Sequence, residues 1–377
     1  MRIKRLGKDT DSVKVMQKLG VDKLGIKIMA KKAEILLFYI VDMHVGAANI
    51  LKQDALSVGA DLAIPNGTIT CAFKRVDALL IGTKKHIEIL AKKELAQPYG
   101  LRELARELRK YLGPKEYEPK IMGIINATND SFYPGSRFSP EGAVAAVERM
   151  IKQGADIIDI GGMSTRPGSE EIGEEEELER VRPIIDTLAP LQLGVKLSID
   201  TYRPKVARYA LERGFCILND ITGLENDEMA KIAAQFGASV VIMHKKGDPK
   251  TMQQNPFYED VVAEVSQFFK ERIEKAKSFG IEDIILDPGI GFGKRLEDNL
   301  QLLKDLVEFR KFGYEILVGA SRKSMIDKII PAPVEERLPG TLALHQLALE
   351  NGASILRCHD VAAHRQMIEV YKAYKRI

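Results

Sequence analysis

Polar side chains follow a series of short apolar runs in the second part of the chain. Nearly every run, from Ile121–Ile125 to Ser354–Leu356, ends beside residues that can donate or accept hydrogen bonds. These residues are Asn126, Asp200, Asn219, Asp220, His244, Asp287, Ser321, Arg322, Lys323, Arg357 and His359. A single polar residue after a strand is most often a helix cap or a turn former. Polar groups at the same end of nearly every run instead predict a concave site where several of them meet one ligand.

The types of these residues indicate a flat, nitrogen-rich heterocycle as part of that ligand. The carboxylates of Asp200 and Asp287 can each accept two N–H bonds from an aminopyrimidinone edge, and such charged pairs are stronger than neutral ones. Asn219 adds an amide, and Lys323 can donate to a ring oxygen or nitrogen. The four residues together favour a polar ring over an aliphatic substrate.

The remaining positions suit the faces of the ring and an anionic group. Met243 and Phe292 can supply apolar faces. Arg357 and His359 follow the last run, where barrels often bind phosphate groups. With Asn126 they can hold an anionic leaving group. The residues alone therefore predict a polar heteroaromatic ligand with an anionic tail.

Eight apolar runs alternate with eight helical segments in this part of the chain. The runs are 121–125, 156–160, 196–199, 216–218, 239–242, 283–286, 316–318 and 354–356. The helical segments are 141–153, 175–188, 204–213, 227–236, 261–278, 298–312, 341–350 and 361–374. Alternating strands and helices require a parallel sheet. The count of eight, and the lack of a Gly-rich dinucleotide fingerprint, favour a closed (β/α)₈ TIM barrel over an open doubly wound sheet.

The first 115 residues have a different pattern and predict a small α/β N-terminal domain. We expect strands at 35–41, 61–64, 68–73 and 78–81, and helices at 47–57, 83–93 and 101–112. Gly113-Pro114 breaks the last helix and marks the boundary, so residues 116–377 form the barrel domain. Asp42, His44 and His86 are the obvious polar candidates in the N-terminal domain, but no active-site motif contains them. A structural or oligomer-packing role is favoured there over a second activity.

Composition limits the classes of partner and the compartment. The chain has 377 residues, and its 56 Lys and Arg against 53 Asp and Glu give a formal net charge of +3, which provides no electrostatic argument for nucleic-acid binding. The three cysteines are far apart in the sequence, which favours a reducing cytoplasm. The N-terminus lacks the apolar core of a signal peptide, and the longest apolar runs are too short to span a bilayer. We expect a cytoplasmic protein with neither nucleic-acid nor membrane partners.

Two long segments and several short ones resemble the signatures of the dihydropteroate synthase family. The long segments are Ile121-Met122-Gly123-Ile124-Ile125-Asn126-Ala127-Thr128-Asn129-Asp130-Ser131-Phe132 and Gly154 to Gly168, which includes Asp159-Ile160-Gly161-Gly162. The short ones are Ser198–Thr201, Asn219-Asp220, Met243-His244, Leu286–Lys294, Ser321–Ser324, Gly340-Thr341 and Arg357–Ala362. The resemblance covers residues 119–377 and implies a pterin-binding TIM barrel.

The resemblance also implies a role for each site residue. The pterin would be bound by Asp200, Asn219, Met243, Asp287, Phe292, Gly319 and Lys323. The pyrophosphate would be bound by Asn126, Arg357 and His359, with Asn126 also contacting a Mg²⁺ ion. The 4-aminobenzoate would be bound by Phe132, Thr165, Arg166, Pro167 and Ser324, the last at the start of the seventh helix.

The implied reaction joins 6-hydroxymethyl-7,8-dihydropterin pyrophosphate to 4-aminobenzoate, giving 7,8-dihydropteroate and pyrophosphate in folate biosynthesis. Asp200, Lys323 and Asn126 would be the catalytic residues, and no protein nucleophile is required. Members of this family are transferases and sulfonamide targets that commonly form homodimers, so both substrates and a second copy are the expected partners.

Three positions depart from the family pattern, and two other functions have to be weighed. Met163 stands where Glu is common, Asn129 where Pro is usual, and Lys245-Lys246 where a Met-Arg pair is usual. A pterin-binding methyltransferase would share the barrel but would not need the Ser321–Ser324 motif or the anion-binding pair after the last strand. A non-catalytic pterin-binding relative gains slight support from the departures. The intact set of site residues argues against it.

Overall fold

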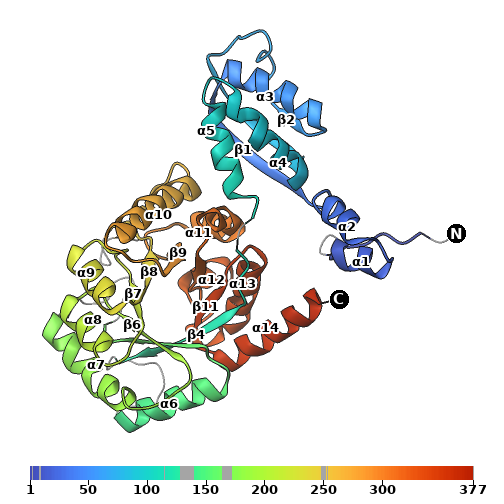
Figure 1. Ribbon diagram of the computed structural model, residues 1–377. Helices are drawn as coiled ribbons and strands as arrows, with labels where there is room; N and C mark the ends of the chain where they lie inside the picture. Colours follow the sequence, from blue (N-terminus) through green and yellow to red (C-terminus); the bar gives the residue numbers. More distant parts are fainter. Residues whose placement is uncertain are drawn as a thin grey trace. The chain divides into compact units, whose positions relative to one another are not determined.

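The computed structural model describes residues 1, 3–7, 10–113, 115–127, 140–163, 172–247, 252 and 254–376. Two compact units divide the chain (Figure 1): residues 1–114 together with 373–377, and residues 115–372. The division after residue 114 coincides with the Gly113-Pro114 break in the sequence.

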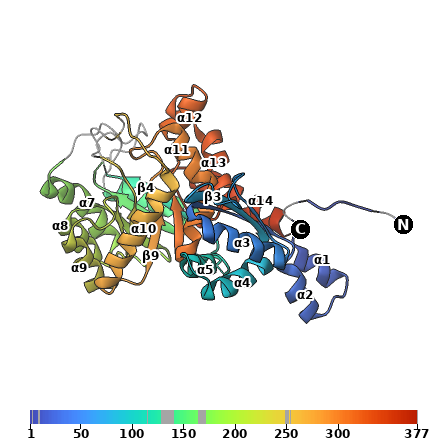
Figure 2. The ribbon, with the colours of Figure 1, turned by 90° about the horizontal axis from the view of Figure 1, so that it is seen from above.

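The larger unit contains a closed barrel of eight parallel strands, as the sequence predicts. Figure 2 shows this unit from a second direction. The strands are β4 (Lys120–Asn126), β5 (Ile157–Gly161), β6 (Lys196–Asp200), β7 (Ile217–Asp220), β8 (Ser239–Met243), β9 (Ile284–Asp287), β10 (Glu315–Val318) and β11 (Ile355–Cys358). Their order around the barrel follows the chain, and β11 pairs with β4 to close it. The carboxyl ends of all eight strands therefore surround one mouth.

Helices follow the strands within a few residues of their predicted positions. They are α6 (Pro140–Lys152), α7 (Glu174–Leu188), α8 (Pro204–Leu211), α9 (Asp227–Phe236), α10 (Val261–Ser278), α11 (Leu296–Lys304), α13 (Leu338–Glu350) and α14 (Val361–Lys375). The single helix expected at 298–312 is wrong, because α11 ends at Lys304. The next residue, Asp305, has a φ of −105° and a ψ of 24°, which are not helical, and a 3₁₀ segment, η2 (Leu306–Phe312), follows. A short helix not predicted as a separate element, α12 (Ser324–Ile329), lies between β10 and α13.

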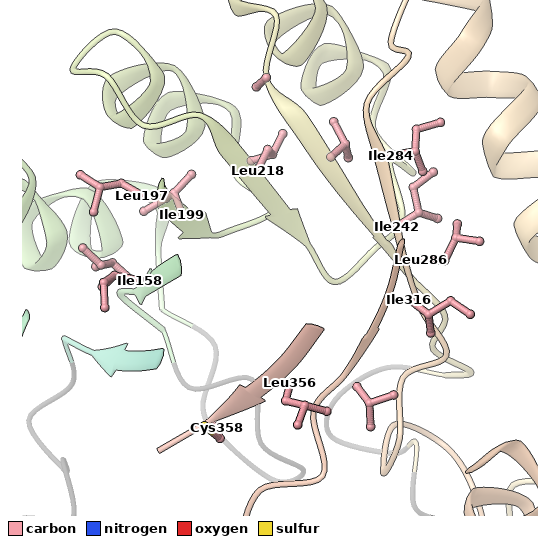
Figure 3. Close-up of a cluster of buried hydrophobic side chains, with 14 of the residues drawn as sticks. Ile158, Leu197, Ile199, Leu218, Ile242, Ile284, Leu286, Ile316, Leu356 and Cys358 are labelled. Carbon is pink, nitrogen blue, oxygen red and sulfur yellow. The ribbon is translucent and has the colours of Figure 1, made fainter. Parts of the chain in front are cut away.

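Two apolar layers result from the alternation of side chains along the strands. One set of residues fills the barrel interior: Met122, Ile157, Ile217, Val241, Ile285, Leu317 and Ile355. Their neighbours along the strands point outward and pack against the helices, among them Ile158, Leu197, Ile199, Leu218, Ile242, Leu286 and Leu356 (Figure 3). The interior layer lies below the mouth, so the next inward-facing residue of each strand belongs to the mouth itself.

The smaller unit is a three-stranded antiparallel sheet with helices. Its strands, in the order β1-β3-β2, are β1 (Ile35–His44), β2 (Asp61–Ala63) and β3 (Arg75–Thr83). Its helices are α1 (Ser12–Lys18), α2 (Lys23–Ala30), α3 (Val45–Val58), α4 (Lys84–Lys93), η1 (Glu94–Ala96) and α5 (Leu101–Lys110). α1 and α2 were not predicted. Leu51, Leu62, Leu80, Leu90 and Leu101 are fully buried in its core.

The strand predicted at 68–73 is wrong, because this segment forms turns. Thr68 Oγ1 donates to Pro65 O over 2.6 Å, and Thr70 Oγ1 donates to Gly67 O over 3.0 Å. Hydroxyl side chains that bond to nearby backbone compete with sheet pairing, and this local bonding outweighs the strand preference of threonine.

No helix in the described ranges is long and apolar enough to cross a membrane.

Candidate active site

Most of the inward-facing residues at the barrel mouth are polar. Asp200 and Asp287 end β6 and β9, Asn219 is in β7, and Arg357 is in β11. Strand alternation places each of them on the same side as the interior apolar layer, one step nearer the carboxyl end. The predicted convergence of these four side chains is therefore present.

Arg357 joins residues from four strands into one cluster. Its Nε donates to Asp159 Oδ2 over 2.7 Å, and its Nη2 donates to Asp200 Oδ2 over 2.6 Å. Asn219 Nδ2 donates to the same oxygen of Asp159 over 3.0 Å. Asp159, in β5, is fully buried. It orients both the guanidinium and the amide, which are the donors expected to meet a ligand.

Sequence reasoning missed Asp159. The residue lies inside a strand, whereas the predicted polar residues of the site come at or after the ends of their strands. The available signal was alternation: Asp159 is two residues after the inward-facing Ile157, so it faces the interior. A carboxylate there needs a cationic partner, because an unpaired buried charge is costly.

Burial has a strong effect on the acids of this mouth. It raises the pKa of Asp200 to about 7, an effect that Arg357 opposes and Asp159 reinforces. Burial also raises the pKa of Asp287, against the influence of Lys323. The Oδ1 atoms of Asp159 and Asp200 are buried and have no hydrogen-bond partner among the described residues. Asp200 therefore keeps one acceptor oxygen for a ligand.

Lys323 lies across the mouth from this cluster, beside Asp287. Its Nζ donates to the carbonyl of Ile290 and lies 4.4 Å from the centre of the Phe292 ring. Burial lowers the pKa of Lys323 to about 8, and Asp287 acts in the opposite direction. A side chain added at Gly319 would approach Arg357, with its Cβ 3.7 Å from that of the arginine. A cation, an acid and an aromatic ring are thus available to one flat ligand.

The loops after β10 and β11 are joined to each other. Ser321 Oγ and His359 Nδ1 are 2.9 Å apart. Arg322, whose φ of 53° is left-handed, makes two bonds of 2.9 Å to the carboxylate of Asp360. The segment that carries both Arg357 and His359 is therefore tied to the loop after β10.

Two buried histidines support these loops from below. Ala320 N donates to His345 Nε2 over 3.0 Å, and His345 Nδ1 lies 2.8 Å from His364 Nε2. His364 Nδ1 in turn lies 2.7 Å from Asp360 O. Burial lowers the pKa of both rings, so both are neutral and each passes one hydrogen bond along the chain.

Other predicted residues have mixed outcomes. Asn126 is half-buried at the end of β4, and Met243 is buried at the end of β8. Asp220 faces away from the mouth and accepts bonds from the backbone of Thr222 and Leu224, so it forms a turn. Ser324 is exposed and begins the six-residue α12; the expectation that it begins the seventh barrel helix is wrong, since that helix is α13.

Four residues expected around 4-aminobenzoate lie outside the described residues: Phe132, Thr165, Arg166 and Pro167. Met163, one of the departures from the family pattern, is described and buried.

The described residues contain no group of three or more His, Cys, Asp or Glu side chains able to hold a metal ion. The carboxamide oxygen of Asn126, at the end of β4, is of the hard type that a divalent cation could use. A divalent cation at this site would therefore depend mainly on oxygens of a bound phosphate.

Comparison with known proteins agrees with this geometry. A family profile described as "Pterin binding enzyme" matches residues 122–359. A bifunctional dihydropteroate synthase/dihydropteroate reductase of Helicobacter pylori is 41% identical over 377 residues, covering 99% of both chains.

Solved structures agree over the barrel. The dihydropteroate synthase of Yersinia pestis with a sulfonamide drug complex has a TM-score of 0.66 and 39% identity, covering 69% of this chain and 95% of its own. That of Xanthomonas albilineans in complex with 7,8-dihydropteroate has a TM-score of 0.62 and 39% identity, covering 69% of this chain and 95% of its own. The barrel, the cluster at its mouth and these similarities lead to one conclusion: the chain belongs to the pterin-binding enzyme family.

Proposed function

We infer that this chain catalyses the dihydropteroate synthase reaction, a step of folate biosynthesis. The substrates are 6-hydroxymethyl-7,8-dihydropterin pyrophosphate and 4-aminobenzoate, and the products are 7,8-dihydropteroate and pyrophosphate. The observation that carries this inference is the Arg357 cluster, in which a guanidinium, two acids and an amide meet at the barrel mouth. It suits a ligand with a hydrogen-bonding ring and an anionic group.

The pterin ring would lie between the Arg357 cluster, which includes Asp200, and Lys323. Oδ1 of Asp200, with no partner among the described protein atoms, can accept from a ring N–H, and Asp287 and Asn219 offer further polar atoms. Lys323 can exchange its bond to Ile290 O for one to the ring. Phe292, Met243 and the bare backbone of Gly319 would complete the pocket.

The reaction is a substitution at the exocyclic methylene carbon of the pterin. The C–O bond breaks and its electron pair leaves with the pyrophosphate, whose negative charge Arg357 would partly neutralise while His359 and Asn126 donate hydrogen bonds to it. The aniline nitrogen of the second substrate, 4-aminobenzoate, then forms the C–N bond and loses a proton. Asp200 would stabilise the positive charge that develops on the pterin between these events. No side chain has to form a covalent bond.

We propose that Mg²⁺ assists the departure of the pyrophosphate. The donor set fits an ion carried chiefly by the substrate, because Asn126 offers one hard oxygen and Mg²⁺ keeps waters and phosphate oxygens as its other ligands. When bound, the ion would neutralise part of the charge of the leaving group.

The 4-aminobenzoate would bind at the loops beside the mouth. Phe132, Thr165, Arg166, Pro167 and Ser324 are proposed for this role on the family resemblance. Sulfonamides, which resemble this substrate in outline, would compete for the same place. We also propose a homodimer in the cytoplasm, as is common in the family, with neither nucleic-acid nor membrane partners.

The test is release of pyrophosphate by the purified full-length chain with both substrates and Mg²⁺. Release that depends on 4-aminobenzoate, formation of dihydropteroate, and loss of both in Lys323→Ala support the synthase function. Pterin binding without turnover contradicts it, and would favour the methyltransferase or the non-catalytic relative.

A second candidate function concerns residues 1–114. The Helicobacter pylori relative carries the name dihydropteroate reductase as well as synthase, and its similarity covers 99% of each chain, so it includes a counterpart of this unit. The structures of single-function synthases match only 69% of the chain. We propose that the full chain also reduces 7,8-dihydropteroate.

The structural role expected for these residues from sequence remains the alternative. The test is conversion of 7,8-dihydropteroate to tetrahydropteroate by the full-length chain, with a reduced nicotinamide cofactor or a reduced flavin as electron donor. Failure with both donors contradicts the reductase proposal and leaves the synthase function untouched.

A further inference from the structure

Lys294 is a fully buried lysine that the reaction described above does not use. It has 1% of its surface exposed and lies in the loop between β9 and α11. Its ammonium lies 2.9 Å from His244 Nδ1, 3.0 Å from Gly289 O, 3.1 Å from Phe292 O and 3.3 Å from His244 O. Burial lowers the pKa of Lys294 to about 7, an effect that Asp287 opposes. In the protonated form, the three shortest contacts match the three hydrogens of the ammonium group.

These contacts join two segments of the barrel mouth. His244 follows β8, whereas Gly289 and Phe292 belong to the loop after β9. Burial lowers the pKa of His244 to about 2, an effect that Lys294 reinforces, so the imidazole is neutral and its Nδ1 can accept. The ammonium therefore holds the two segments together through acceptors on both.

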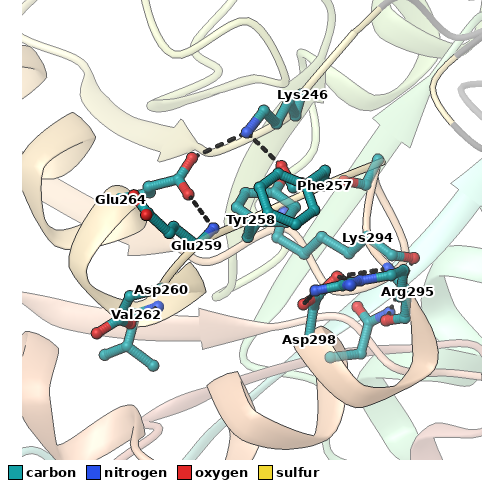
Figure 4. A network of polar contacts seen from close by, with 12 residues as sticks. Lys246, Phe257, Tyr258, Glu259, Asp260, Val262, Glu264, Lys294, Arg295 and Asp298 are labelled. Atoms are coloured by element: carbon teal, nitrogen blue, oxygen red, sulfur yellow. Dashed lines mark hydrogen bonds and ion pairs between the residues drawn. The ribbon is translucent and has the colours of Figure 1, made fainter. Parts of the chain in front are cut away.

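The backbone of the loop after β9 is pressed against the segment after β8. Gly289 and Gly293 have φ values of 66° and 62°, and a Cβ on either would overlap the carbonyl oxygen of His244 or Lys246, respectively. Tyr258 Oη donates to Gly293 O over 2.9 Å in a buried bond. Figure 4 shows Lys294 between Tyr258 and the ion pair of Arg295 with Asp298. The loop after β9 is therefore closely packed on both sides, and the Lys294 ammonium donates hydrogen bonds to two of its carbonyls.

This loop forms one wall of the proposed pterin pocket. Ile290 O accepts from Lys323, and the Phe292 ring lies 4.4 Å from the Lys323 ammonium. The first carbonyl bound by Lys294 is two residues after Asp287, whose Oδ1 accepts from Gly289 N over 2.7 Å. A shift of the loop would therefore move Phe292, Lys323 and Asp287 together.

We propose that Lys294 is a positioning residue for the pterin: its ammonium fixes the loop after β9, and so sets Phe292 and Lys323 against Asp287. This proposal rests on the proposed synthase function. It predicts that loss of the ammonium weakens pterin binding selectively, because 4-aminobenzoate is expected at other loops of the mouth.

The test compares Lys294→Met with Lys246→Met in the full-length chain. Lys246 lies in the same region, and Lys246→Met is the matched control. It removes an ion pair with Glu264 and a contact with the Tyr258 ring, whose centre is 4.1 Å from the ammonium. The readouts are the KM for each substrate, kcat, Tm, and calorimetric affinity for the pterin alcohol, 6-hydroxymethyl-7,8-dihydropterin.

Pterin affinity in Lys294→Met should fall by roughly 10- to 100-fold, the scale expected for misplacement by about 1 Å. The Michaelis constant for the aminobenzoate substrate should stay within about twofold, and Lys246→Met should change only Tm. Unchanged pterin affinity, or an equal rise in both KM values, overturns the proposal.

Two further measures keep the test decisive. If Lys294→Met does not fold, Lys294→Gln supplies two of the donors and should show a smaller but still selective loss, and an unselective loss overturns the proposal. If the wild-type chain binds the pterin alcohol but does not turn over the pterin pyrophosphate with 4-aminobenzoate, the synthase function fails. The affinity measurements then still decide whether Lys294 positions the pterin pocket.

Discussion

Replacing Asp159 tests the account of the barrel mouth most directly. Its Oδ2 accepts from Arg357 over 2.7 Å and from Asn219 over 3.0 Å, and the side chain is fully buried. Asp159→Ala removes one partner of a buried ion pair, which typically costs about 3–5 kcal/mol. Because Arg357 keeps its bond to Asp200, we expect the lower end, about 3 kcal/mol.

Asp159→Asn should be much milder. The amide oxygen can still accept both bonds, and only the added strength of the charged acceptor is lost, about 1 kcal/mol. The change also removes a carboxylate that raises the pKa of Asp200, and this offsets part of the loss. The two variants therefore separate geometry from charge.

Urea denaturation followed by circular dichroism measures the free energy of unfolding, and steady-state kinetics measures the KM for the pterin pyrophosphate. Asp159→Ala should raise this KM about tenfold, equivalent to about 1.4 kcal/mol, because Arg357 loses its anchor. Asp156, just before β5, is the control: it also binds an arginine, Arg365, over 2.8 Å, but 40% of its side chain is exposed. Asp156→Asn should cost at most about 1 kcal/mol and leave the KM unchanged.

The reasoning is refuted if Asp159→Ala loses less than about 1 kcal/mol, or if Asp159→Asn is as damaging as Asp159→Ala. The first result would mean that the buried Arg357 guanidinium is held in place without its bond to Asp159. The second would mean that charge, not the arrangement of acceptors, holds the cluster.

Three other substitutions have defined outcomes. Burial raises the pKa of Glu177 from 4.5 to about 6, so its contribution to stability is complete below pH 4.5 and is lost as the pH rises through 6. Between about pH 4.5 and 8, the wild type should therefore lose about 2 kcal/mol of unfolding free energy relative to Glu177→Gln in urea titrations. A difference between the two proteins that does not change with pH would count against the raised pKa. Gly289→Ala should lose at least about 2 kcal/mol of unfolding free energy in chemical denaturation. Gly280→Ala, with a φ of 83° and no atoms within 4 Å of the added Cβ, is the control and should lose about 1 kcal/mol. Equal losses would contradict the close approach of Gly289 to the His244 carbonyl. Met122→Ala, inside the barrel, should lose about 2–5 kcal/mol in the same assay, and a loss below about 1 kcal/mol would argue against a packed interior.

Much of the barrel could be predicted from local patterns. Strand and helix positions follow from the spacing of apolar residues, since side chains repeat every two residues in a strand and every 3.6 in a helix. The predicted helices at 227–236 and 261–278 match α9 and α10 residue for residue. The polar residues at the strand ends could be predicted as one group, because all parallel strands direct their carboxyl ends to the same mouth.

Local patterns failed where two local tendencies competed. The segment 68–73 has the composition of a strand, but its hydroxyl groups bond to neighbouring carbonyls and form turns. The helix expected at 298–312 changes type at Asp305, and nothing in the apolar spacing marks that change. Both errors arise because propensity and spacing do not describe how each backbone group is satisfied.

The sequence by itself determined the barrel, the order of its elements and the residues available at its mouth, because these depend on local periodicity. Only the tertiary structure decided which of those residues meet. Asp159 and Arg357 are 198 positions apart and come together because β11 pairs with β4 and β4 with β5. Lys294 reaches His244, 50 positions away, only when β8 and β9 are neighbours. Closure of the barrel brings these partners within hydrogen-bonding distance, and a charge buried in this way is stable only when its partners surround it.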